Sequence, residues 1–243
     1  MHWKEQKKHT YKCVNKGEYM FDKYFGFLRS QDEETILNSL LEHAQIDAEE
    51  LHILSKMSVV IFKKEEGDLE TMHAQICTIN EGNVKIFESV ADHIVQSNFD
   101  FQKQYDLLRI QQRIDTVSSL IIATSKRILI AKSIGTTMPE ELYVSYKQLV
   151  DMVVQSHQTF VQAIQKYRES RKDVIKLIHQ AELEENLVDN MRAECLNVIY
   201  QLANDGTLRM GDFRAMEGIV EYFEDISDAI KSATTSLDWL LLN

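Results

Sequence analysis

The chain contains very few residues that break α-helices. Its 243 residues include a single proline, Pro139, and only eight glycines. In a helix interior, proline costs about 3 kcal/mol and glycine about 1 kcal/mol relative to alanine. A chain of this length that uses both so rarely favours long helices joined by short turns.

Cysteine and long apolar runs are scarce as well. Cys13, Cys77 and Cys195 are isolated, with no Cys-x-x-Cys pair and no Cys/His spacing of the zinc type. An odd, sparse set of cysteines indicates reduced thiols, so we expect an intracellular, cytoplasmic protein. The sequence has no run of about 18 apolar residues, which argues against a membrane-spanning helix.

The first 19 residues are rich in lysine but carry no apolar stretch, so they do not resemble a secretory signal. We expect residues 1–19 to form a basic, loosely ordered arm. Met20, followed by Phe and Asp, resembles a natural start of the protein.

The chain as a whole is acidic, with a formal net charge of -11 and an isoelectric point near 5.2. Binding to a phosphate backbone requires a basic face, so we expect no nucleic-acid partner. An acidic chain is better suited to metal cations or to basic partner surfaces.

Apolar residues recur at helical spacing along nearly the whole chain. The first clear stripe runs from Ile36 through Leu40 and Ala44 to Leu54 and predicts a long amphipathic helix. Residues 135–139, which include two threonines between a glycine and the proline, mark the clearest turn. The predicted helices cover about residues 32–64, 69–96, 101–133, 139–168, 170–203 and 210–242.

This pattern predicts an all-α fold of six long helices, arranged as two tandem three-helix bundles. We expect residues 20–135 to form the first bundle and residues 136–243 to form the second. The two bundles are expected to pack as one globular unit.

The two halves of the chain have the same order of features. The break at residues 98–100 corresponds to the break at residues 204–206. In the helices that follow these breaks, Gln111 is opposite Glu221. Matching features in the same order are typical of an internal duplication.

Pairs of acids spaced four residues apart are the most informative local pattern. Residues i and i+4 of a helix lie on the same face, so a Glu-x-x-x-Asp pair directs two carboxylates to one patch. Two like charges placed in this way weaken a helix by a few tenths of a kcal/mol. The pattern occurs at Glu88/Asp92, Glu185/Asp189, Glu221/Asp225 and Glu224/Asp228.

These acids have two interpretations. Buried carboxylates need a proton, a cationic side chain or a metal ion, and oxygen ligands suit hard cations and iron in carboxylate clusters. In one interpretation the acids converge to bind metal. In the other they form a solvated face with ion pairs to residues such as Arg192 and Lys231.

Two histidine motifs leave a different function open. Glu49-x-x-His52 and Glu70-x-x-His73 have the spacing found in di-iron carboxylate proteins, which would make the chain a ferritin-like oxidase. A metal-free helical adaptor is a third interpretation. The sequence shows no Gly-rich phosphate loop, nucleophile elbow or convincing triad, so it does not predict an enzyme.

From about Met20 to its last residue, the chain resembles the PhoU-like regulators of phosphate transport, and within them the branch associated with Pit-type transporters. The resemblance rests on residues 86–92 and the following helix through Asp115, and on residues 185–189 and 221–230. Members of this family collect metal ions through Glu/Asp-x-x-x-Asp motifs on paired helices of each bundle. In this chain, Gln111 takes the place of the acid that the motif at Asp115 expects.

The resemblance implies a non-enzymatic regulator or accessory protein of phosphate transport that contacts a Pit-type membrane transporter, at the inner face of the membrane. Whether the chain forms a homo-oligomer stays open. The implied cofactors are divalent or trivalent metal ions, drawn from Mg, Mn, Fe and Zn. The implied metal ligands are Glu88, Asp92, Asp115, Glu185, Asp189, Glu221, Asp225 and Asp228.

Overall fold

Six helices make up the part of the chain that the structure describes. The computed structural model covers residues 6–63 and 67–242, with side chains for residues 31–62 and 67–241, and no β-strand occurs within these ranges. The all-α fold predicted from the sequence is confirmed. None of the described helices is long and apolar enough to cross a membrane. The helices are α1 (Gln6–Lys63), α2 (Leu69–Gln96), α3 (Phe101–Ser133), α4 (Glu140–Lys166), α5 (Arg171–Asn204) and α6 (Met210–Leu242).

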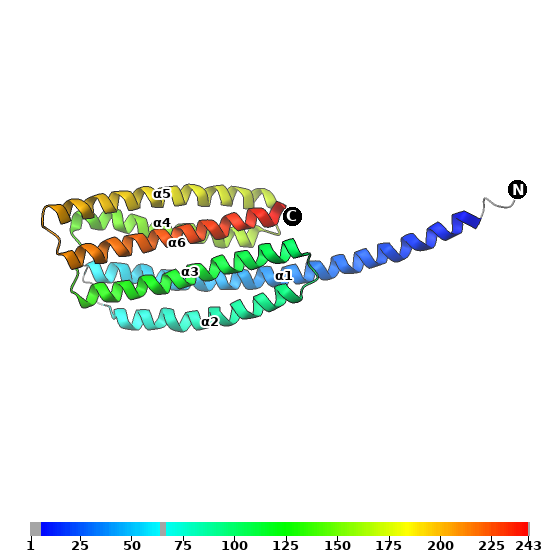
Figure 1. The fold of residues 1–243 in the computed structure, drawn as a ribbon, viewed down its shortest axis with the longest axis horizontal. Helices are drawn as coiled ribbons and strands as arrows, with labels where there is room; N and C mark the ends of the chain where they lie inside the picture. The colour runs from blue at the N-terminus through cyan, green and yellow to red at the C-terminus, as the bar shows by residue number, and fades with distance from the viewer. Residues whose placement is uncertain (1–5, 64–66, 243) are drawn as a thin grey trace.

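The start of α1 differs from the sequence prediction. The other helix ends agree with the predictions to within about two residues, but α1 begins at Gln6. Residues 6–19 are therefore part of this helix, and residues 1–5 lie outside the described residues. No proline interrupts this part of the chain, so a helix formed farther along can extend through it residue by residue. Figure 1 shows the N-terminal part of α1 projecting beyond the other five helices.

Glycines end α3 and α5 in the same way. Gly135 follows α3 with a φ of 68°, and Gly206 follows α5 with a φ of 79°. In each turn, the N–H of the residue after the glycine bonds to the carbonyl five residues earlier, at 3.0 Å. This is the Schellman arrangement, in which the left-handed residue is usually glycine. The turns predicted at these two places are confirmed.

The six helices form two three-helix bundles that lie side by side (Figure 1). Helices α1, α2 and α3 form the first bundle, and α4, α5 and α6 form the second. The bundles meet where α3 packs along α6 and where α1 packs along α4. Near one end of the α3–α6 seam, the Arg109 guanidinium lies 4.2 Å from the ring centroid of Trp239.

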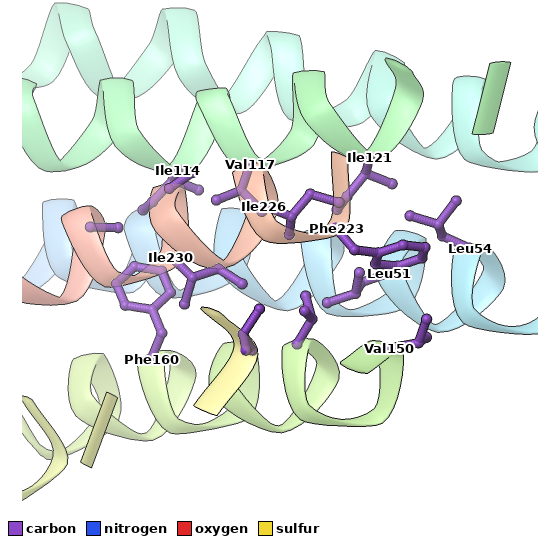
Figure 2. Close-up of a cluster of buried hydrophobic side chains, with 14 of the residues drawn as sticks. Leu51, Leu54, Ile114, Val117, Ile121, Val150, Phe160, Phe223, Ile226 and Ile230 are labelled. Atoms are coloured by element: carbon purple, nitrogen blue, oxygen red, sulfur yellow. The ribbon is translucent and has the colours of Figure 1, made fainter. Parts of the chain in front are cut away.

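One hydrophobic core joins the two bundles. Side chains from α1, α3, α4 and α6 meet in this core, as Figure 2 shows. Phe62 of α1, Tyr146 of α4 and Phe223 of α6 form a row of edge-to-face rings, with centroid separations of 5.1 and 6.0 Å. The core thus continues across the boundary between the halves.

Candidate functional site

The five acids predicted on α5 and α6 lie on adjoining faces of these helices. Glu224 of α6 is close enough to Asp189 of α5, and to Asp225 and Asp228 of its own helix, for their negative charges to act on it. The negative charge of Glu221 acts on Asp225 in the same way. Glu224, which the sequence analysis noted but did not place among the metal ligands, joins the group. We call these residues the α5–α6 acidic patch: Glu185, Asp189, Glu221, Glu224, Asp225 and Asp228.

Two cationic side chains lie within the patch. Arg192 donates to Oε2 of Glu221 from Nε at 2.8 Å and from Nη2 at 2.7 Å. Its Nε also lies 3.8 Å from Oε2 of Glu224. Lys231 Nζ lies 2.6 Å from Oε1 of Glu185. The interpretation in which Arg192 and Lys231 pair with these acids is therefore confirmed for Glu185 and Glu221.

Partial burial and the excess of negative charge raise carboxyl pKa values in the patch. Burial, followed by the charge of Asp228, raises the pKa of Glu224 to about 7. Burial, followed by the charge of Glu221, raises the pKa of Asp225. Arg109 and Arg113 of α3 also line a pocket beside Asp228 and Lys231. The six acids still outnumber these four cationic side chains, so an additional cation that enters the patch is favoured electrostatically.

The three acids predicted in the first bundle have different surroundings. Glu88 and Asp92 are exposed on α2, whereas Asp115 is half-buried on α3. Burial raises the pKa of Asp115, and its charge acts on Asp47 of α1. Within residues 31–62 and 67–241, no group of three or more His, Cys, Asp or Glu side chains is arranged to hold a metal ion. The metal ligands stay a prediction.

The sequence analysis missed a set of buried polar residues in the middle of the first bundle. Asn83 Nδ2 donates to Asp47 Oδ1 at 2.8 Å and also lies 3.4 Å from Glu50 Oε1 and 3.3 Å from Ser118 Oγ. Ser118 donates to Asp47 Oδ1 at 2.5 Å, and His43 Nε2 lies 3.3 Å from Ser118. All of these side chains are at most 1% exposed. We call them the buried polar centre: His43, Asp47, Glu50, Asn83, Gln111 and Ser118.

Burial dominates the electrostatics of this centre. It raises the pKa of Glu50 to about 8 and raises the pKa of Asp47 well above its usual range. It also lowers the pKa of His43 to about 4. Low dielectric disfavours the charged form of each group, so Glu50 and His43 are mainly neutral near pH 7, and burial favours the protonated form of Asp47.

A sequence signal for this centre exists on α1. Asp47 falls on the same helical stripe as Leu40, Ala44, Leu51 and Leu54, at a position where an apolar residue is expected. An acid inside an otherwise apolar stripe indicates a buried carboxyl that needs a partner.

The histidine motifs do not form a di-iron site. His52 is exposed on α1. His73 of α2 lies with Nδ1 2.8 Å from Ser125 Oγ, and Glu70 of the same motif forms an ion pair with Lys132. The geometry of the described residues therefore gives the ferritin-like interpretation no support.

Comparisons with known proteins identify the fold. No protein-family model and no curated protein matches the sequence. The crystal structure of a PhoU-like protein from Shewanella oneidensis MR-1 matches with a TM-score of 0.74 and 15% identity, over 85% of this chain and 99% of that chain. A PhoU-like phosphate regulatory protein from the same organism matches with a TM-score of 0.73, the same identity and the same coverage. At this identity the likeness establishes a PhoU-like fold.

Proposed function

We propose that this chain is a non-enzymatic regulator or accessory protein of inorganic phosphate transport. The observation that carries the proposal is the six-helix fold, which matches a PhoU-like phosphate regulatory protein over 85% of the chain. The α5–α6 acidic patch supports it, because the patch contains the carboxylate pairs to which the family resemblance assigns metal binding. The proposal places the protein in the cytoplasm, at the inner face of the membrane.

The second part of the proposal is that the patch binds divalent or trivalent metal ions such as Mg, Mn, Fe or Zn. Carboxylate oxygens suit these ions, and Asp189, Asp225 and Asp228 are exposed to solvent. An ion that binds deeper in the patch competes with Lys231 for Glu185, which is 7% exposed. Metal binding should therefore depend on the strength of this ion pair.

The third part of the proposal concerns the partner, a Pit-type phosphate transporter. Cytoplasmic loops of membrane proteins are enriched in Lys and Arg. The acidic patch is complementary in charge to such loops, and complementary charge favours fast and specific association. Metal ions bound in the patch would reduce its negative charge and so weaken or reorganise this contact.

Phosphate uptake in cells tests the regulatory role. Uptake of labelled phosphate is measured in the source organism, in a strain without the gene and in strains that carry variants. We expect uptake to change when the gene is deleted and to be restored by the natural chain. The double variant Asp189→Asn/Asp225→Asn removes two exposed patch acids and should restore uptake incompletely. Unchanged uptake in the deletion strain, at both low and high external phosphate, would contradict the proposal.

The matched control has the same charge change away from the patch. Glu140→Gln/Glu141→Gln removes two exposed acids from the first turn of α4 and should restore uptake as well as the natural chain does. Co-purification of a Pit-type transporter with the tagged protein from membranes tests the contact. If the control variant loses uptake or co-purification to the same extent as the patch variant, net charge rather than the patch is responsible.

Calorimetry with each metal ion tests the metal part separately. The natural chain and the α4 control variant should bind the ion, whereas Asp189→Asn/Asp225→Asn should bind it more weakly. If the natural chain binds none of the four metals while deletion of the gene still changes phosphate uptake, the metal part is wrong and the regulatory role stands.

A further inference from the structure

The buried polar centre has oxygen atoms that no donor satisfies. Four of its atoms make no hydrogen bond: Asp47 Oδ2, Glu50 Oε2, Asn83 Oδ1 and Gln111 Oε1. Each belongs to a side chain that is at most 1% exposed. All four are oxygens. The two amide oxygens require a hydrogen-bond donor or a cation, and the two carboxyl oxygens require a proton, a donor or a cation. An acceptor buried without a partner loses its hydration and gains nothing in return.

The donors within the centre already have partners. Asn83 Nδ2 and Ser118 Oγ both donate hydrogen bonds to Asp47 Oδ1. Gln111 Nε2 lies 3.4 Å from His43 Nδ1. When Asp47 and Glu50 are ionised, no donor of the centre is left for the four oxygens, so a proton or a cation from outside the set must meet them.

No lysine or arginine supplies that charge. The hydrogen bonds and ion pairs of Asp47 and Glu50 among the described side chains involve His43, Asn80, Asn83 and Ser118, none of which is a lysine or an arginine. Burial lowers the pKa of His43 to about 4, so its ring is neutral near pH 7. The α5–α6 acidic patch differs in this respect, because Arg192 and Lys231 lie against its acids.

The polar atoms of the centre lie close enough together to converge on one ion, and the Ser118–Asp47 contact of 2.5 Å must lengthen for both oxygens to bind it. Asp47 Oδ1, Glu50 Oε1 and Ser118 Oγ surround Asn83 Nδ2 at 2.8, 3.4 and 3.3 Å. Neighbouring oxygens around a Ca²⁺ ion are about 3.3 Å apart when the metal–oxygen distances are about 2.4 Å. A half-turn of the Asn83 amide exchanges its nitrogen for its unpartnered oxygen and makes all four atoms oxygens.

We propose that the buried polar centre binds one divalent cation that prefers oxygen ligands, held by Asp47 and Glu50 together with Asn83 and Ser118. Two carboxylates match the charge of such an ion, and the neutral amide and hydroxyl oxygens complete a set that suits Ca²⁺ better than the smaller Mg²⁺. The site uses no residue of the Glu-x-x-x-Asp pairs. It does not rest on the proposed role in phosphate transport.

The position of the site sets how the ion enters and leaves. None of its ligands reaches solvent, so exchange requires local opening of the first bundle. A cation binds carboxylates in their ionised form, so binding competes with protons on Asp47 and Glu50. We expect slow exchange, with stronger binding under mildly alkaline than under mildly acidic conditions.

Metal analysis of the full chain tests the proposal. The protein is treated with a chelator, incubated for long periods with Ca²⁺, Mg²⁺ or Mn²⁺ singly at about pH 8, desalted, and measured for metal per chain and for its unfolding midpoint. We expect the natural chain to retain about one Ca²⁺ and to unfold at a higher temperature with the ion bound. Asp47→Asn should lower the affinity by about 100-fold or more and remove the shift in midpoint.

Matched variants locate the ion. Asp92→Asn removes an exposed acid from the same bundle, and Asp189→Asn/Asp225→Asn removes two acids from the α5–α6 acidic patch. Both should retain the slowly exchanging ion. Glu50→Gln provides a second ligand variant if Asp47→Asn does not fold, and it should also lose the ion.

Several outcomes would overturn the proposal. These are the absence of any retained divalent ion in the natural chain, and retention of the ion by both Asp47→Asn and Glu50→Gln. A third is loss of the ion in the patch variant alone, which would place it in the α5–α6 acidic patch and support the proposed function instead. A chain that retains no divalent ion and becomes more stable with Asp47→Asn would show that protons alone satisfy the centre.

Discussion

The two bundles have the same architecture but place their polar groups in different environments. In the second bundle, the Glu221 side chain is 35% exposed and is paired with Arg192. Gln111, opposite Glu221 in the duplicated order, is fully buried in the first bundle. With the same offset, Ser118 is opposite Asp228, and it too is buried while Asp228 is exposed.

This difference shows what each environment requires of an acid. At the surface of the second bundle, water and two cationic side chains keep several carboxylates close together at small cost. Inside the first bundle, α3 carries Gln111 and Ser118 opposite Glu221 and Asp228, and the buried acids Asp47 and Glu50 come from α1. These buried acids need protons or a bound cation, because no lysine or arginine contacts them among the described side chains.

The largest expected effect tests whether the bundles are one cooperative unit. Phe223→Ala removes a fully buried ring from the row that joins α1, α4 and α6, and should lower the free energy of unfolding by about 3–5 kcal/mol. Urea unfolding followed by both circular dichroism and fluorescence should show a single transition. Phe101→Ala, at a side chain that is 82% exposed, should change stability by less than about 0.5 kcal/mol. Two separate transitions would mean that each bundle unfolds independently.

Acid should destabilise the second bundle through a histidine that has no polar partner. Burial lowers the pKa of His157 to about 4 from its usual 6.5, and neither ring nitrogen is hydrogen-bonded. The unfolded chain therefore binds the additional proton, so stability is lost as pH falls from about 6.5 to about 4. His157→Gln should reduce the loss between about pH 7 and pH 5 by about 2 kcal/mol, measured by urea unfolding at each pH.

Measurements of the same variant at higher pH provide the control. Between about pH 7 and pH 8 His157 is neutral in both the folded and the unfolded chain, so the difference between variant and natural protein should stay constant there. If the variant retains the full loss of stability between pH 7 and pH 5, other groups are responsible for it.

Removal of one cation from the α5–α6 acidic patch should leave a mostly buried acid of the second bundle without a cationic partner, as in the first bundle. Lys231→Met leaves Glu185 without its cation, although the Glu185 side chain is only 9% exposed. We expect a loss of about 1–2 kcal/mol, less than for a fully buried pair because Lys231 is 37% exposed. If metal ions bind in the patch, calorimetry should show tighter binding by this variant, because the competing ammonium is gone.

A surface ion pair on α4 serves as the comparison. Lys147→Met removes the exposed partner of Asp151 and should cost less than about 0.5 kcal/mol, with no change in metal affinity. Equal losses for the two lysine variants would show that Glu185 is better solvated than its exposed fraction suggests.

The sequence predicts the helices well because their ends depend on local chemistry. The apolar period runs without interruption between turns, and Gly135 and Gly206 end α3 and α5 through a backbone conformation that glycine favours. The acids of α5 and α6 were also predictable, since residues four apart share a face whatever the rest of the fold does.

The buried polar centre was not predictable in the same way. It is assembled from three helices, and its closest contacts join Asp47 with Asn83 and Ser118, which are far apart in the sequence. Periodicity gives the apolar stripe of each helix, but not the rotation of one helix against another, and this rotation decides which flanking residue is buried. Asp47 and Ala48 are adjacent in sequence, yet only Asp47 is fully buried.

The smallest expected effect concerns the glycine turns that end α3 and α5. It tests whether these two turns contribute equally to the free energy of unfolding. Gly135→Ala and Gly206→Ala each place a side chain at positive φ, with no atom within 4 Å of the added carbon, so backbone strain alone should cost about 1 kcal/mol in both. Gly82→Ala, within α2 and equally open, should instead stabilise by up to about 1 kcal/mol, because alanine favours the helix. Urea unfolding measures all three. Unequal costs at Gly135 and Gly206 would mean that similar turns contribute differently in the two bundles, whereas a loss at Gly82 would show that helix propensity does not control stability in α2.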